Sequence, residues 1–147
     1  MNFSRLTIAV IVLDLLIPFA AGHGMGFLGM IEMPFVSFFT NDSLSLSPSA
    51  DYEHSLFGAA LFSLTGQLFL LVSIWIKKPV AVFRVKIIGL IFLCVGYFYL
   101  VHNIFSEDGS LSAFSGFFGL GFFVCSIILI YKMVRERRKT SGRFDTL

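Results

Sequence analysis

Three histidines are the main candidates for binding chemistry in this 147-residue sequence. His23, His54 and His102 each lie near an end of a long apolar stretch, and we expect these three ends to share one side of a membrane. Imidazole nitrogens bind zinc and copper, and two of them can ligate haem iron. The three residues therefore form a candidate metal or haem site.

The spacing of the histidines does not by itself identify a ligand. The sequence has no HxxxH, HExxH or CxxCH pattern, and the three side chains would come from three separate segments. The alternative is that histidines gather at the membrane interface, because the ends of a membrane helix tolerate polar side chains better than its centre. Both interpretations stay open at the level of sequence.

Asp14 is the one acid well inside an apolar stretch. An aspartate at the centre of a membrane helix costs about 2.5–3.5 kcal/mol on insertion scales, so we expect its side chain to face protein. One interpretation is a structural hydrogen bond to another helix, for which Gln67 is the candidate partner. The other is a relay for protons or cations, because intramembrane acids are often functional.

Four glycines indicate close helix packing. Gly22 and Gly26 form a GxxxG pair in the first apolar stretch, and Gly116 and Gly119 lie near serines in the last one. Small side chains let two helix backbones approach each other closely. We therefore assign all four glycines to contacts between helices.

The first apolar stretch also has features of a cleavable signal peptide. Arg5 precedes it, and residues 20–22 are small residues near a suitable cleavage point. However, Asp14 interrupts its apolar core, and the apolar character continues to Leu28. We therefore expect an uncleaved membrane helix.

The composition identifies lipid as the main solvent of this chain. Apolar residues make up 56% and charged residues 14% of it, whereas soluble domains average about 45–50% and 25%. The sequence has no nucleophile–base pattern, P-loop or dinucleotide fingerprint. We therefore expect a membrane protein that is not an enzyme.

Four apolar stretches are long enough to cross a bilayer as helices, which takes about 20 residues. Lipid offers backbone groups no hydrogen-bond partners, so each segment that crosses the membrane has to form hydrogen bonds within its own backbone, as a helix does. The sequence predicts an all-α integral membrane protein with one domain, a four-transmembrane-helix up-down bundle. The expected helices cover about residues 6–28, 56–76, 85–105 and 113–134, with an outer loop at 29–55 and a basic tail at 135–147.

The basic residues predict the orientation of this bundle. All 11 Lys and Arg residues lie before the first stretch, around the connection between the second and third, or at the end of the fourth. Cytoplasmic segments are enriched in Lys and Arg, so we expect both termini in the cytoplasm and a multi-pass protein of the plasma (inner) membrane. Lys86, at the start of the third stretch, is expected to snorkel to the interface.

The expected partners follow from this placement. They are the lipid bilayer, anionic inner-leaflet lipids for the basic tail, and a second copy or another membrane protein; nucleic acid is not expected. We favour a non-enzymatic interaction or accessory subunit, in which Asp14 and the glycines serve helix association. The alternatives are a metal- or haem-binding protein using the three histidines and a proton- or ion-coupled transporter using Asp14.

Overall fold

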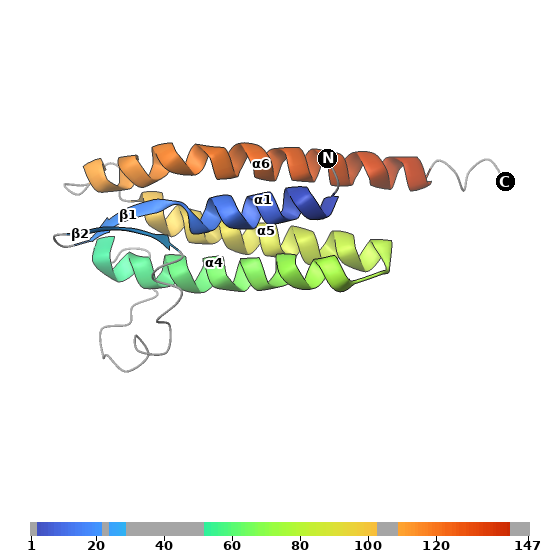
Figure 1. Cartoon of the computed structure of the whole chain (residues 1–147), viewed down its shortest axis with the longest axis horizontal. Coiled ribbons are helices and arrows are strands. Elements are labelled where there is room, and N and C mark those ends of the chain that lie inside the picture. Colours follow the sequence, from blue (N-terminus) through green and yellow to red (C-terminus); the bar gives the residue numbers. More distant parts are fainter. Residues whose placement is uncertain (1–2, 22–23, 29–51, 103–108, 142–147) are drawn as a thin grey trace.

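The computed structural model of the chain describes residues 3–21, 24–28, 52–102 and 109–141. Within these ranges four α-helices run side by side, and a two-stranded antiparallel hairpin lies at one end of them (Figure 1). Helix α4 packs against α5 and α1, and α6 packs against the same two helices. The elements are α1 (Phe3–Leu15), β1 (Pro18–Ala21), β2 (Gly24–Phe27), α4 (Tyr52–Trp75), α5 (Pro79–Val101) and α6 (Gly109–Ser141).

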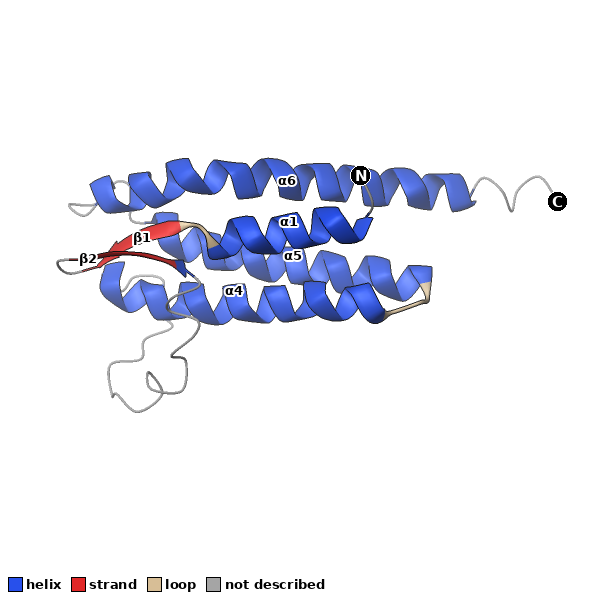
Figure 2. Cartoon of the chain, in the orientation of Figure 1, coloured by secondary structure: helices blue, strands red, loops and turns tan. Residues whose placement is uncertain are grey.

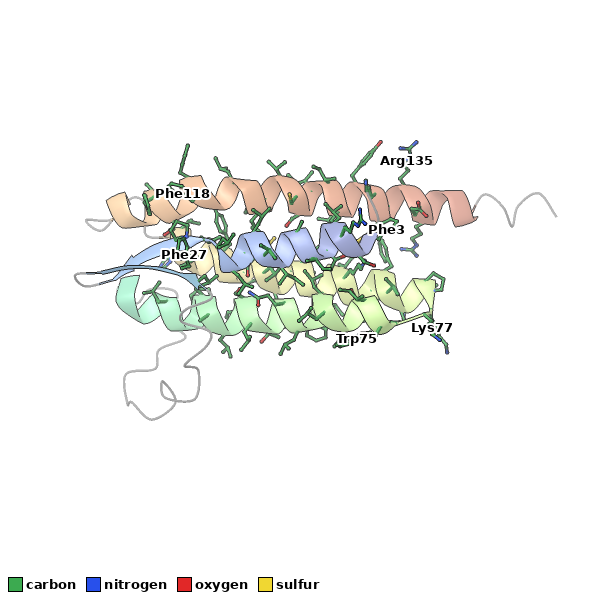
Figure 3. All side chains as sticks on the ribbon, in the orientation of Figure 1. Phe3, Phe27, Trp75, Lys77, Phe118 and Arg135 are labelled. Atoms are coloured by element: carbon green, nitrogen blue, oxygen red, sulfur yellow. The ribbon has the colours of Figure 1, made fainter. Side chains whose placement is uncertain are left out.

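Helices α4, α5 and α6 are long and apolar enough to cross a membrane. Their apolar parts, Gly58–Trp75, Pro79–Val101 and Ala113–Arg137, contain 18, 23 and 25 residues, against about 20 needed to span a bilayer. Figure 3 shows large apolar side chains, such as Trp75 and Phe118, projecting from the outer sides of the helices. The chain is thus a multi-pass membrane protein built on a helical bundle.

The first helix is shorter than the sequence predicted. It ends at Leu15, and the segment beyond it pairs as β1 and β2, drawn in red in Figure 2. Its 13 residues rise about 20 Å at 1.5 Å per residue, too little to cross a bilayer alone. The prediction of one helix over residues 6–28 is therefore wrong beyond Leu15.

Pro18 explains why α1 stops. A proline has no backbone N–H to donate to the carbonyl four residues before it, which is that of Asp14, and its ring collides with that carbonyl. The N–H of Ile17 donates to the Asp14 carbonyl instead, at 3.1 Å, and closes a tighter last turn. The N–H of Leu28 then donates to the Ile17 carbonyl at 2.9 Å and closes the base of the hairpin.

The other helices extend further into their polar ends than expected. Helix α5 begins at Pro79, because a proline in the first turn needs no N–H partner. Helix α6 continues to Ser141, so residues 135–141 of the expected tail are helical. Arg, Lys and Glu form helices well, and the polar sequence that ends the apolar span does not end the helix. Helix α4 begins at Tyr52, inside the expected outer loop.

Glycines bring the backbones of α4 and α5 into contact. A Cβ on Gly66 would lie 2.7 Å from the carbonyl oxygen of Gly89, and a Cβ on Gly96 would lie 3.0 Å from that of Ala59. Along α4, Ala59 comes before Gly66, but their partners on α5 come in the reverse order. The two helices are therefore antiparallel. The lack of side chains at these positions allows this close approach.

The buried positions of all four helices repeat with alternating steps of three and four residues. This period of 3.5 keeps one face of each helix toward its neighbours over the whole length of the bundle. Many of these positions hold small or polar residues. The buried series are Thr7, Val10 and Asp14; Leu56, Ala59, Ser63, Gly66, Leu70 and Ser73; Lys86, Gly89, Leu93, Gly96 and Leu100; and Ser115, Gly119, Phe122, Ser126, Leu129 and Met133.

The variant Gly66→Ala tests the close contact of α4 and α5. The added methyl group overlaps the Gly89 carbonyl, and overpacking of this kind costs about 1–3 kcal/mol. We expect the thermal unfolding midpoint of the purified protein in detergent to fall by several degrees. Gly121→Ala is the matched control, because the nearest atom to its added Cβ is 4.0 Å away. Equal midpoints for the two variants would contradict this packing.

Candidate functional site

Asp14 lies in the last turn of α1 and is buried against α4, with 1% of its side chain exposed. The Oγ of Ser63 and the Nε2 of Gln67 both donate hydrogen bonds to its Oδ2, the latter at 2.9 Å. The same Nε2 lies 3.1 Å from the Ser63 Oγ and donates to it. Asp14 and Gln67 are therefore in contact, and Ser63 joins them; we call these three residues the polar cluster.

The local sequence positions each member of the polar cluster. Ser63 and Gln67 are four residues apart on α4, so their side chains lie on one face of that helix. Asp14 continues the buried face of α1 that includes Val10, and Pro18 ends the helix just beyond it. The cluster therefore ties the end of α1 to the middle of α4.

One oxygen of the Asp14 carboxyl has no partner in the part of the chain that the structure describes. Its Oδ1 is buried and receives no hydrogen bond within the described ranges, and the hydrogen-bond donors to the carboxyl there are the neutral Ser63 and Gln67. Burying a charge without a counter-charge is costly, which is why buried carboxyls are paired or neutral. Chemically, the arrangement can hold two helices together, or it can exchange a proton at Oδ1.

The candidate histidine site is described only in part. His102 follows the last residue of α5, and its Nδ1 lies 2.9 Å from the carbonyl oxygen of Tyr99. Its Nε2 is buried and has no partner among the described residues. His23 and the side chain of His54 lie outside the described residues, so the convergence of the three stays a prediction. Among the residues that the structure does describe, no three His, Cys, Asp or Glu side chains are grouped to hold a metal ion.

The two glycines of α6 lie beside Tyr97 of α5. The Tyr97 hydroxyl donates to the carbonyl of Gly116 at 2.7 Å, and a Cβ on Gly119 would overlap the tyrosine ring. Both positions therefore serve the contact of α5 with α6. Gly26 lies in β2, and Gly22 is outside the described residues. The expectation that Gly26 packs on a helix face is thus wrong, because Gly26 lies in a strand.

Two further signals in the sequence point to these contacts. Ser63 lies four residues before Gln67, so any partner of Gln67 on a neighbouring helix would be within reach of both. Gly89 and Gly96 lie seven residues apart, which is the repeat that keeps two residues on one packing face. The four-residue spacing of a serine from a buried glutamine, and the seven-residue spacing of two glycines, therefore indicate residues that share a packing face.

No family model matches the chain, and neither a curated protein nor a solved structure matches it. What the protein does is therefore inferred from the residues described above.

Removing the Asp14 carboxyl should loosen the contact of α1 with α4. Hydrogen bonds between membrane helices contribute about 0.6 kcal/mol on average and up to about 1.7 kcal/mol. We expect a double-mutant cycle of Asp14→Ala and Gln67→Ala, followed by chemical unfolding, to give a coupling energy in this range. Val12→Ala, at a position of α1 that is 45% exposed, is the control and should couple with neither.

Asp14→Asn separates the structural role from a proton-carrying one. The amide keeps an oxygen that accepts from Ser63 and Gln67 but cannot exchange a proton as a carboxyl does. The variant should therefore unfold near the wild-type midpoint. A coupling energy of zero in the cycle would show that the polar cluster does not hold the two helices.

Proposed function

We propose that this protein is a non-enzymatic interaction or accessory subunit of the plasma (inner) membrane. The observation behind the proposal is the burial of Asp14 within the bundle, where α4 supplies two hydrogen-bond donors to it. A coupling acid in a transporter faces each side of the membrane in turn. Because this carboxyl is enclosed by helix contacts, its surroundings favour helix association over proton- or ion-coupled transport.

In this proposal both termini lie in the cytoplasm. Lys77 and Arg135 lie at the same end of the bundle, and Phe27 of the hairpin lies toward the other end (Figure 3). An end rich in Lys and Arg faces the cytoplasm. Helix α1 and the hairpin together make the fourth crossing of an up-down bundle. The strands bond to each other and β1 packs on α6, which limits the exposure of backbone groups to lipid.

The outward face of α6 is the surface on which we place the partner. Phe117, Leu120, Val124 and Ile127 on this face are 70%, 55%, 56% and 60% exposed. The face carries bulky apolar side chains, which pack against lipid tails or against the helix of another membrane protein. The partner is either a second copy of the chain or a different membrane protein.

Photo-crosslinking tests the partner role. A photoreactive residue at Ile127 should give a protein adduct in native membranes, whereas one at Leu129, which is 0% exposed, should react only within the chain. An adduct of twice the chain's mass identifies a second copy, and any other protein adduct identifies a different partner. Adducts with lipid alone at Ile127 would contradict the proposal.

A protease test checks the orientation. If both termini lie in the cytoplasm, tags fused to them should resist protease that is added outside intact cells.

The surroundings of His102 favour a second candidate function, which is metal or haem binding. The Tyr99 carbonyl can only accept, so Nδ1 carries a hydrogen, which leaves Nε2 as the nitrogen through which this imidazole would bind a metal. Metal-binding histidines commonly donate one ring N–H to a carbonyl in this way and bind through the other nitrogen. His23 and His54 are the proposed further ligands.

Elemental analysis and a visible spectrum test this second candidate. Protein purified without chelators should contain stoichiometric zinc or copper, or show a haem spectrum, and His102→Ala should lose it. Tyr131→Phe, an exposed position far along α6, is the control and should keep it. Wild-type protein without metal and without haem would rule out this function.

A further inference from the structure

A cavity lies at the basic end of the bundle, between the starts of α1 and α5 and the end of α6. Its volume is about 370 Å³, which is within the range of sites for small ligands. Phe3, Phe83 and Met133 contribute an apolar wall to it, one from each helix. The cavity is therefore shaped by three helices and is not a groove along one of them.

The charged residues that line this cavity are mostly basic. Arg84, Lys86 and Arg137 contribute three positive charges, and Glu136 contributes one negative charge. The guanidinium of Arg137 lies 4.9 Å from the centre of the Phe83 ring. A cation–π contact of this kind holds a cation in place without neutralising it. The lining therefore carries a net positive charge that attracts an anion.

Lys86 is the buried charge among these residues. Only 4% of the residue is exposed, so its side chain is enclosed by protein at this end of the bundle; that it snorkels to the interface stays a prediction. Its Nζ lies 5.4 Å from the centre of the Phe3 ring, and no carboxylate among the described residues pairs with it. A buried ammonium without an anion is destabilising, and an aromatic ring offsets only part of that cost.

We propose that this cavity binds an anionic phospholipid. Lys86 pairs with the phosphate group, and the guanidinium groups of Arg84 and Arg137 donate further hydrogen bonds to its oxygens. The glycerol and the first carbons of an acyl chain lie against Phe3 and Phe83. A free phosphate would use the charges and leave the apolar wall uncovered, so a lipid matches both parts of the lining.

The proposal rests on the membrane placement given above and is independent of the partner role. In that placement the cavity lies at the inner leaflet, where anionic lipids give the surface a negative potential. Exposed basic residues such as Arg135 also attract these lipids, but dissolved salt weakens the attraction between exposed charges. Lys86 is shielded from water, so its contact with one lipid is specific and joins α1, α5 and α6.

Native mass spectrometry of the full-length protein tests the proposal, with dioleoyl phosphatidylglycerol as the probe and dioleoyl phosphatidylcholine as the zwitterionic comparison. We expect the anionic lipid to bind about tenfold more tightly, and Lys86→Met to remove about that factor. Arg135→Gln removes one exposed charge of the same sign and should leave the affinity within about twofold of wild type.

Three results would overturn the proposal. They are unchanged phosphatidylglycerol affinity in Lys86→Met, equal binding of the two lipids, and displacement of the lipid by inorganic phosphate at equal concentration, which would indicate a site for free anions. If Lys86→Met does not fold, Arg84→Gln at the exposed rim of the cavity replaces it. That variant should weaken binding about threefold, and an unchanged affinity would also overturn the proposal.

Discussion

Lipid tails are as apolar as the outer faces of these helices, so the burial of apolar side chains against one another contributes little to holding the bundle together. The helices are held together instead by close contact between their backbones and by buried hydrogen bonds. At Gly66 and Gly89 the backbones of α4 and α5 touch, and this antiparallel pair sets the frame for the other elements. With α4 in place, Ser63 and Gln67 face α1, and with α5 in place, Tyr97 reaches α6.

The polar cluster attaches α1 to this frame, and Pro18 limits how far α1 extends. The two features are linked, because the carbonyl that Pro18 cannot bond belongs to Asp14 itself. The helix therefore ends where its only buried acid meets α4, and the chain continues as a hairpin whose strands bond to each other. The pairing of β1 with β2 thus bonds backbone groups beyond the end of this 13-residue helix.

Two residues of the polar cluster were accessible to sequence reasoning, and the third was not singled out. Asp14 and Gln67 are conspicuous because each is polar within an apolar stretch. Ser63 is not, since serines are common in membrane helices and hydrogen-bond within their own backbone. The packing glycines of α4 and α5 were equally hard to select, because these helices are apolar on every face and hydropathy does not mark the face turned inward. The spacing of seven residues between Gly89 and Gly96 indicates the inward face better than hydropathy does.

The sequence by itself predicted four membrane-spanning helices, and three helices long and apolar enough to span a membrane are found. These were predictable because apolar length and composition are local properties of the sequence. It also determined where the basic residues gather. Only the tertiary structure decided which side chains meet Asp14 and that Lys86 is enclosed beside Phe3. These outcomes depend on the register of one helix against another. Contacts between backbones far apart in the chain set that register, and no local stretch of sequence contains it.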